Sequence, residues 1–493
     1  MRRELRFLRR GQQVRLAGFA PTLTLLDYLR LHERSVGTKE GCAEGDCGAC
    51  TVVLRKNVGG GICYQPVNSC ILLAGQADGS EVITVEDLAG GGSLHPVQRQ
   101  MVDLHGSQCG FCTPGFVMAL FALYHKEGRV PLDRQTVNDW IAGNLCRCTG
   151  YRPIVDAALA SCGGPAADRF VADEQAASDS LTAIGDDDDL FVGSDAQFFA
   201  APSSISALAS LYEKHPDAVL VAGATDVGLW ITKKLQSLPK IIWLGRVRGL
   251  DAIVDASVAV TFGAMATHES AMPYLAAIDH DLGELMRRFA GKQIRTVATI
   301  GGNIANGSPI GDTPPALIAL GATLTLQKGD TERDLALEDF FIAYGRQDRA
   351  AGEFVRSVRV PKLTASERFR CYKVSKRFDQ DISAVMGAFK FTLAGSRIES
   401  ARIAFGGMAA TPKRAGKAET ALAGADLAHE ASWEPALAAL GIDYAPITDQ
   451  RASAQYRVDV ARALLRKAIR EVSGTSTGAT RIAGTRETAS AGA

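Results

Sequence analysis

Eight cysteines in the first third of the chain have the spacing of metal ligands. Of the eleven cysteines in 493 residues, ten precede residue 163. Eight of these ten form two quartets, which are Cys42, Cys47, Cys50 and Cys70, then Cys109, Cys112, Cys146 and Cys148. Thiols grouped at short spacings favour metal binding over disulfides in a reducing compartment.

The first quartet has the pattern Cys-x4-Cys-x2-Cys followed by a distant cysteine, which is the spacing of plant-type two-iron clusters. Three thiolates must converge from one loop. Gly41, Gly45 and Gly48 let the backbone wrap closely and adopt positive φ while its amides point at the sulfurs. A structural zinc ion is the alternative, although zinc sites usually pair Cys-x2-Cys with a second such pair.

The second quartet combines Cys-x2-Cys with Cys146-Arg147-Cys148 after a long gap. Two loops at helix ends can bring these four sulfurs together. The spacing alone is less diagnostic, so zinc remains open as an alternative to a two-iron cluster. Cys63, Cys162 and Cys371 have no partner at ligand spacing, and we expect them to be small buried apolar residues.

The elements that position these ligands follow from the apolar pattern. Residues 5–16 alternate around a Gly-Gln turn, which predicts a hairpin, and residues 23–31 carry a leucine stripe, which predicts a helix. Residues 51–54 and 82–85 are further strand candidates. From 96 to 160 the apolar residues recur at helical spacing, so helical hairpins are expected to place both halves of the second quartet at helix ends.

Residues 163–194 contain few large apolar side chains and an Asp run, and this composition predicts a solvated linker. The residues from 473 onward are mostly small and polar, which predicts disorder. Between them, strands alternate with helical stretches in a mixed α and β region. The strand candidates are 218–222, 241–244, 258–262, 323–326 and 354–360.

Two glycine-rich segments of this region could bind phosphate. Val219 to Gly228 is a strand that runs into a glycine turn, where exposed amides can form an anion-binding nest, although an ordinary tight turn is an equal alternative. Neither the P-loop nor the Gly-x-Gly-x-x-Gly pattern is present. A second loop, Thr299 to Asp312, could hold the other phosphate of a dinucleotide. Two-iron clusters pass one electron at a time, so a dinucleotide that also exchanges hydride would be a flavin, with the electron source on a partner subunit.

The charge and hydropathy pattern excludes other classes. Lys plus Arg total 54 and Asp plus Glu total 54, so the zero net charge argues against an electrostatic grip on nucleic acid or membrane. Charges interrupt the first ten residues where a signal peptide needs an apolar run, and no apolar stretch is long enough for a membrane span. A cytoplasmic protein is therefore expected.

Several motifs resemble those of the molybdenum hydroxylase family. The iron–sulfur motifs are Thr38 to Cys50, Gly106 to Gly115 and Gly143 to Tyr151. The flavin motifs are Gly223 to Asp226, Gly301 to Asn303, Ser308 to Ile310 and Arg377 to Ile382. Fused in this order, without a molybdenum part, they resemble the small subunits of bacterial xanthine dehydrogenases.

The resemblance implies an α+β multidomain fold. It implies a β-grasp, plant-type ferredoxin domain over 1–90 and a helical [2Fe-2S]-binding bundle over 91–162, followed by the linker 163–194. It also implies an FAD-binding domain of the PCMH or vanillyl-alcohol-oxidase type over 195–368, a C-terminal domain like that of the CO dehydrogenase flavoprotein over 369–472, and a disordered tail over 473–493.

The resemblance also assigns ligands. Each cysteine quartet would hold a [2Fe-2S] cluster, the second nearer a molybdopterin that Gln108 and Cys148 face, and the first nearer the flavin. The positions that match FAD-binding residues are Leu220, Val221, Ala222, Gly223, Ala224, Thr225, Asp226, Val227, Phe289, Thr299, Ile300, Gly301, Gly302, Asn303, Asp312, Val355 and Lys373. From the residues alone, Phe289 and Val355 would be core packing.

By the same resemblance, the chain is expected to pass electrons from purine hydroxylation on a molybdopterin-bearing large subunit to NAD, in an (αβ)2 assembly. Alternatives are the same role in an aldehyde or N-heteroaromatic dehydrogenase, or a zinc-binding scaffold protein. The family's Phe-Phe-x-Gly-Tyr-Arg stretch departs here, because Gly345 stands between Tyr344 and Arg346. This departure bears on the NAD site.

Overall fold

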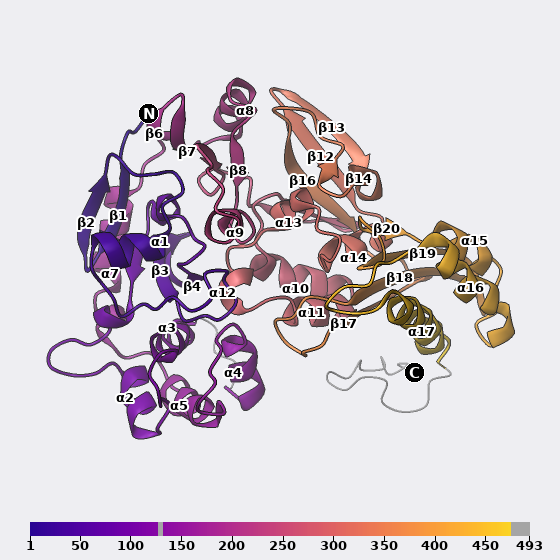
Figure 1. Cartoon of the computed structure of the whole chain (residues 1–493), viewed down its shortest axis with the longest axis horizontal. Helices are drawn as coiled ribbons and strands as arrows, with labels where there is room; N and C mark the ends of the chain where they lie inside the picture. Colours follow the sequence, from indigo (N-terminus) through magenta and orange to yellow (C-terminus); the bar gives the residue numbers. More distant parts are fainter. Residues whose placement is uncertain (127–131, 475–493) are drawn as a thin grey trace. The chain divides into compact units, whose positions relative to one another are not determined.

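The computed structural model describes residues 1–126 and 132–474, and the chain divides into two structural units (Figure 1). The first unit comprises Met1–Gly249 together with Ala290–Ala298, and the second comprises Leu250–Phe289 and the residues from Thr299 onward. We call residues 290–298 the strap, because this segment leaves the second unit and packs within the first. The expected multidomain α+β fold is confirmed.

The N-terminal sheet of the first unit has the strand order β2-β1-β5-β3-β4. The predicted hairpin forms between β1 and β2, with Gly11 at φ +72° in its turn, and β1 pairs in parallel with β5. A short helix, α1 (Leu25–Asp27), continues into a π-helical turn, Tyr28–His32. The strands are β1 (Leu5–Arg9), β2 (Gln12–Leu16), β3 (Thr51–Val58), β4 (Gly61–Asn68) and β5 (Glu81–Ile83).

A bundle of helices follows, as predicted. Its core is α3, whose residues from Gly115 to Tyr124 are all buried, and this core continues onto Val53 and Ile83 of the N-terminal sheet. The helices are α2 (Pro96–Asp103), α3 (Thr113–Tyr124), α4 (Arg134–Ile141) and α5 (Arg152–Cys162).

Residues 163–194 are not the solvated linker that their composition predicts. They form α6 (Arg169–Ala172), α7 (Glu174–Ile184) and β6 (Leu190–Ser194). Leu181 and Ile184 are buried against the N-terminal sheet. Two apolar side chains a helical turn apart are enough to dock a short amphipathic helix. The polar composition of the whole segment hides this short apolar pattern.

A second sheet in the first unit has the order β6-β7-β9-β8. Its apolar face shares one core with the N-terminal sheet, because side chains such as Phe7 and Phe199 belong to the same buried cluster. The remaining elements are β7 (Gln197–Ala201), α8 (Ile205–Lys214), β8 (Val219–Val221), α9 (Val227–Thr232), β9 (Lys240–Trp243) and, in the strap, α12 (Lys292–Arg295).

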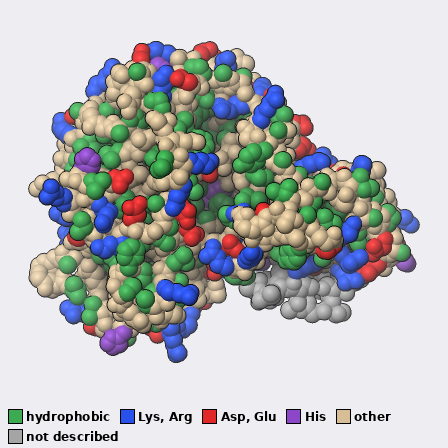
Figure 2. All heavy atoms as spheres, in the orientation of Figure 1, with side chains coloured by type: hydrophobic (Ala, Val, Ile, Leu, Met, Phe, Trp, Pro, Cys, Tyr) green, Lys and Arg blue, Asp and Glu red, His purple; other side chains and the backbone are tan. Residues whose placement is uncertain are grey.

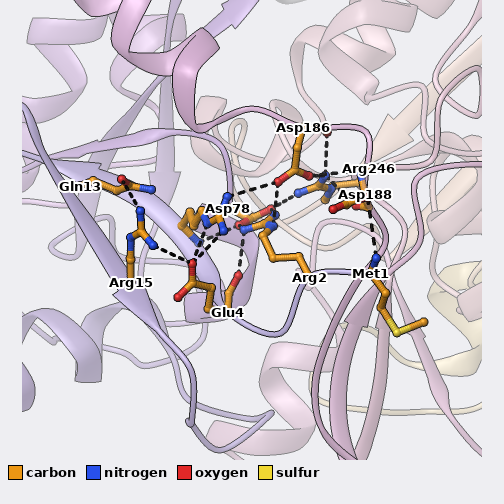
Figure 3. Close-up of polar contacts among 10 residues, drawn as sticks. Met1, Arg2, Glu4, Gln13, Arg15, Asp78, Asp186, Asp188 and Arg246 are labelled. Carbon is orange, nitrogen blue, oxygen red and sulfur yellow. Dashed lines mark hydrogen bonds and ion pairs between the residues drawn. The ribbon is translucent and has the colours of Figure 1, made fainter.

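A buried charge cluster joins four segments of this unit (Figure 3). Asp78, whose side chain is fully buried, accepts hydrogen bonds from Arg2 at 2.5 and 2.8 Å and from Arg246. Arg246 also binds Asp186 at 2.6 Å. The cluster therefore links the N-terminus, the loop before β5, the segment after α7 and the loop after β9.

Among its described residues, the second unit holds three sheets. The orders are β10-β11-β16-β12-β13, β14-β15 and β17-β18-β19-β20. The strands are β10 (Ile253–Asp255), β11 (Ala259–Gly263), β12 (Thr323–Lys328), β13 (Thr331–Ala336), β14 (Phe341–Ala343), β15 (Arg346–Gln347), β16 (Phe354–Pro361), β17 (Glu367–Val374), β18 (Val385–Ala394), β19 (Arg397–Gly406) and β20 (Lys413–Arg414).

The five strand candidates of the sequence correspond to β8 and β9 in the first unit and to β11, β12 and β16 in the second. Helices cover the sheets of the second unit. The helices are α10 (His268–Ile278), α11 (His280–Arg287), α13 (Ile300–Asn306), α14 (Thr313–Leu320), α15 (Gly416–Leu422), α16 (Glu434–Asp443) and α17 (Ala454–Ser473). Helix α17 includes Ser473 and is capped by Gly474, and the rest of the expected disordered tail lies outside the described residues.

The visible surface mixes acidic and basic side chains, as a zero net charge suggests (Figure 2). In the described ranges, none of the helices combines the length and the apolar character that crossing a membrane requires.

Candidate functional site

The first quartet lies on the loop between α1 and β3, with Cys70 just after β4. The Cys42 thiol interacts with those of Cys47 and Cys70, and Cys70 interacts with Cys50, so the four sulfurs converge. The loop has the expected backbone conformation, since Gly45 and Gly48 have φ of +76° and +70°.

Packing and hydrogen bonds fit this loop to thiolates. A Cβ on Gly41 would lie 2.8 Å from Cys47 Sγ. Cys42 Sγ accepts hydrogen bonds from the backbone N–H groups of Glu44, Asp46 and Cys47 at 3.3–3.4 Å. Hydrogen bonds from the Cys47 and Cys70 thiols, aided by backbone N–H groups, hold the pKa of Cys42 well below its usual range. A thiolate at this position is therefore stabilised before any metal binds.

The second quartet lies on two loops, of which only the one that carries Cys112 ends directly at a helix, whereas the sequence predicts helix ends for both halves. Cys112 directly precedes α3, and Cys146 and Cys148 lie between α4 and α5. The thiols of Cys112 and Cys146 interact, as do those of Cys109 and Cys148. Burial and the Cys146 thiol raise the pKa of Cys112 to about 12, so metal binding there must displace a proton.

The two quartets differ in depth. Cys50 and Cys70 are buried, whereas Cys109 and Cys148 are exposed. Gln108, beside Cys109, is exposed as well. The second quartet is therefore the one that a partner can approach from solvent. Of the other cysteines, Cys162 and Cys371 are buried as expected, but Cys63 is exposed, because it faces outward near the start of β4.

The spacing of the sulfurs fits pairs of metal ions better than single ions. With a Zn–S bond of about 2.3 Å, four tetrahedral ligands all lie about 3.8 Å apart. In the described part of the chain, no three cysteine sulfurs lie within 4.8 Å of one another. In the second quartet the sulfurs interact instead as two pairs, which suits a binuclear cluster with two ligands on each metal. In the first quartet the interactions form a chain, because Cys42 contacts Cys47 and Cys70, and Cys70 contacts Cys50.

The predicted flavin residues divide between the units. Leu220–Val227 belongs to the first unit, where β8 runs into the glycine turn and Ala224 has φ +60°. A Cβ on Gly223 would overlap the carbonyl of Val297 in the strap, so this glycine permits close backbone packing. Burial raises the pKa of the Asp226 carboxyl.

This glycine turn is held by the part of the chain that carries the first quartet. Gln76 donates a 3.0 Å hydrogen bond to the carbonyl of Ala222. Gly228 has no room for a Cβ, because Ile71, the residue after Cys70, lies against it. Thr232 of α9 donates to the carbonyl of Ala43 at 2.7 Å. The first cysteine loop therefore packs directly on the predicted flavin turn.

In the second unit, the segment from Thr299 is a helix and not the glycine loop expected from the sequence. Thr299 caps α13 by accepting a hydrogen bond from the backbone N–H of Gly302 at 3.0 Å. A Cβ on Gly301 would overlap Ala264, so this glycine lets the helix approach the end of β11. Close packing explains this glycine without a phosphate.

Two of the predicted residues pair with each other. Lys373 and Asp312 form a buried ion pair at 2.5 Å, and Asp312 also accepts from Ser383 at 2.5 Å. Val355 is buried on β16 beside Leu326 of β12, and the ring of Phe289 lies 4.4 Å from that of His268. Val355 is therefore a packed core residue, whereas Phe289 is half-buried.

The stretch that departs from the family pattern is a hairpin. Tyr344 and Gly345 form the turn between β14 and β15, and Gly345 has φ +67°. The inserted glycine therefore supplies the left-handed conformation of a tight turn. Tyr344 and Arg346 are both exposed.

Sequence reasoning missed the strap and a triad formed by His95, His125 and Asp168. One carboxylate oxygen of Asp168 lies 2.7 and 2.9 Å from the Nε2 atoms of the two histidines. His95 Nδ1 accepts from the Val97 backbone, so its Nε2 carries the proton and donates to Asp168, which disfavours a metal there. The residues are too far apart in sequence for spacing to reveal them.

Three family models match the chain. Residues 84–159 match a [2Fe-2S] binding domain, residues 194–363 match the FAD binding domain in molybdopterin dehydrogenase, and residues 370–472 match the CO dehydrogenase flavoprotein C-terminal domain.

Curated relatives include xanthine dehydrogenase of Emericella nidulans, 32% identical over 89% of this chain and 36% of the relative. Xanthine dehydrogenase/oxidase of Rattus norvegicus is 32% identical over 82% of this chain and 34% of the relative. The chain thus spans about a third of the length of these relatives.

Similar solved structures include a chain of a Cu,Mo-CO dehydrogenase, with 27% identity and a TM-score of 0.53, covering 56% of this chain and 98% of that chain. A chain of reconstituted CO dehydrogenase from Oligotropha carboxidovorans has 28% identity and a TM-score of 0.53 over 56% of this chain and 97% of that chain.

Proposed function

Because the chain belongs to the molybdenum hydroxylase family and carries its iron–sulfur and flavin domains, we propose that it is the electron-transfer subunit of a xanthine dehydrogenase. In this proposal a partner subunit with molybdopterin hydroxylates hypoxanthine and xanthine, in a cytoplasmic (αβ)2 assembly. Two [2Fe-2S] clusters would carry single electrons to FAD, which can reduce NAD by hydride.

The observation that carries the proposal is the packing of the first cysteine loop on the glycine turn. Ile71 follows a cysteine of the quartet and lies against Gly228, and Ala43 between two of its ligands accepts from Thr232. A cluster held by Cys42, Cys47, Cys50 and Cys70 would therefore lie next to a flavin bound at Leu220–Val227. The second quartet, held by Cys109, Cys112, Cys146 and Cys148, has the exposed sulfurs that suit a partner's molybdopterin.

For the flavin, we propose the residues that the family pattern assigns. Asp312 and Lys373 are a matched buried pair, and such a pair can orient a polar ligand without leaving a net buried charge. For NAD, exposed Tyr344 and Arg346 on the β14–β15 hairpin are the proposed contacts.

Metal and flavin analysis tests the cofactor assignment. Two two-iron sites predict about four irons, an equal amount of acid-labile sulfide and one flavin per chain. Protein that is colourless and loaded with zinc would exclude an electron-transfer role and favour the zinc-binding scaffold.

The substrate requires the assembled enzyme. The protein purified with its native partner is expected to reduce NAD with xanthine and hypoxanthine. Turnover only with aldehydes, or only with quinoline-type heteroaromatics, would assign it to another branch of the family. The similarity to CO dehydrogenase chains supports keeping a branch other than xanthine dehydrogenase as the second candidate.

A further inference from the structure

One backbone hydrogen bond joins the two cysteine quartets. The N–H of Leu145 donates to the carbonyl of Cys47 at 2.9 Å. Cys47 is a proposed ligand of the first cluster, and Leu145 directly precedes Cys146, a proposed ligand of the second. The two sets of ligands are therefore connected by a route of covalent bonds with one hydrogen bond in it. Such a route couples an electron donor and acceptor better than empty or loosely packed space does.

Buried side-chain amides hold the two loops that make this bond. Asn144 donates to the carbonyl of Gly48 at 3.0 Å. Gln293, in the strap, donates to Asn144 Oδ1 at 2.7 Å and to Thr51 Oγ1 at 3.2 Å. Asn144 and Gln293 are 2% and 1% exposed. A buried polar network whose donors are satisfied fixes one geometry, so these amides determine how the loops meet.

The backbones in this region are packed too closely for the loops to settle elsewhere without strain. A Cβ on Gly115 would overlap the carbonyl of Gly48, and one on Gly48 would overlap the carbonyl of Gly143. A Cβ on Gly143 would overlap Gln293 Oε1, and one on Gly291 would overlap Gly143. We call Gly115, Gly48, Gly143 and Gly291 the glycine column. It ends at the strap, where Lys292 covers Trp140 at 4.3 Å.

We propose that Gln293 is a positioning residue for electron transfer between the two clusters, an inference that rests on the proposed function because both quartets must hold iron. By donating to Asn144, it keeps the Leu145–Cys47 hydrogen bond formed. The transfer moves one electron from one iron pair to the other, and no covalent bond forms or breaks.

The test uses the full chain loaded with iron and flavin. Gln293→Met keeps a similar side-chain volume but removes both donors. With both iron pairs reduced, electron paramagnetic resonance is expected to show a smaller spin–spin splitting between them than in the unchanged protein. Freeze-quench reduction is expected to show electron transfer between them slowed about tenfold, as for other outer-sphere contacts of metal sites.

Gln65→Met is the matched control, because Gln65 also anchors the strap, but through the carbonyl of Thr296 and not through Asn144. It is expected to leave the splitting unchanged. A Gln293→Met protein with full iron content and unchanged splitting and rate would overturn the inference. Absence of iron from the unchanged protein would instead overturn the proposed function.

If Gln293→Met does not retain iron, Gln293→Glu provides the same test at nearly identical shape. A carboxyl donates to Asn144 only when protonated, and burial raises the pKa of a Glu carboxyl toward neutral pH. The splitting is expected to be reduced at high pH and to recover as the pH falls. A splitting that equals that of the unchanged protein at every pH would contradict the assignment.

Discussion

At the scale of single residues, the sulfurs are surrounded by donors that tune them. Thr149 is the clearest case, because its hydroxyl donates to Cys146 Sγ at 3.2 Å and its backbone N–H donates at 3.5 Å. Hydrogen bonds to cysteine sulfur stabilise the reduced, more negative form of an iron–sulfur cluster.

Thr149→Val is therefore expected to lower the reduction potential of the cluster that we propose at the second quartet. A tenfold fall in the reduced-to-oxidised ratio at fixed potential would correspond to about 59 mV for one electron. A redox titration followed by electron paramagnetic resonance measures the shift. Thr149→Ser keeps the hydroxyl and is expected to stay near the potential of the unchanged protein, whereas an equal shift in both variants would exclude the hydrogen bond as its cause.

The Asp168 carboxyl is expected to make the free energy of unfolding depend on pH in the acidic range. Although its burial opposes ionisation, hydrogen bonds from His125 and His95 hold the pKa of the Asp168 carboxyl well below its usual range. A carboxyl whose pKa is lower in the folded state stabilises that state fully above the unfolded pKa, about 3.9, and this contribution is lost as pH falls toward the folded pKa.

Asp168→Asn is expected to lower the thermal unfolding midpoint at pH 7, with a cost of about 3 kcal/mol for leaving buried donors poorly paired. The difference between the two proteins is expected to narrow below pH 4, because the unchanged carboxyl then loses its own advantage. Calorimetry across this range checks the sign. A gap that is constant with pH would contradict the charged triad.

At the scale of elements, the strap packs so closely on its neighbours that an added side-chain atom has no room. Gly291→Ala would place a Cβ against the backbone of Gly143, and backbone cannot yield as a flexible side chain does. Overpacking of this kind costs about 1–3 kcal/mol. We expect faster hydrogen exchange in residues 143–146 and 290–298 by mass spectrometry.

Gly18→Ala is the control for this substitution, since a Cβ at Gly18 meets no atom within 4 Å. Its exchange pattern is expected to match that of the unchanged protein. If the Gly291→Ala protein exchanged hydrogen at the same rate as the unchanged protein, the strap would have room for a Cβ at this position, contrary to the structure.

Local pattern predicted the elements better than it predicted their packing. The hairpin at residues 5–16, the helix α3 that Cys112 precedes, and most strands follow from periodicity of two or 3.6 residues. The helix α13 was missed, because Gly301 and Gly302 suggest a loop by propensity. Contact between Gly301 and Ala264 overrides that propensity.

The role of the strap could not be predicted, because no pattern within residues 290–298 indicates that Gln293 meets Asn144. Such contacts between distant segments depend on the tertiary fold. The convergence of each cysteine quartet was predictable because metal ligation imposes its own spacing on the sequence. The prediction that Cys63 is buried was wrong, because the direction of its side chain depends on the register of β4.

At the scale of the whole molecule, the first unit depends on the charge cluster around Asp78 (Figure 3). Asp78→Ala would leave Arg2 without its closest carboxylate and would weaken the hold on Arg246, in a region where Arg2 is 3% exposed. Breaking a buried pair by removing one partner costs about 3–5 kcal/mol.

The expected result is a lower unfolding midpoint for the first unit, with little dependence on salt because buried charges are poorly screened. The control is Arg15→Ala, since Arg15 is exposed and contacts Glu4 at 3.2 Å. Exposed pairs of this kind contribute about 0–1 kcal/mol. Comparable midpoints for the two variants would show that the cluster contributes no more than a surface pair.

The route of the strap through the sequence also sets an order of events during synthesis. Residues 1–249 leave the ribosome before residues 290–298 exist, yet the finished first unit includes both. At about 5–20 residues per second, synthesis from Cys148 to the end of the strap takes roughly 7–30 seconds, so the two cysteine loops wait that long for the peptide that packs on them. This interval gives the cell's cluster-delivery machinery time to reach the loops while they are still uncovered.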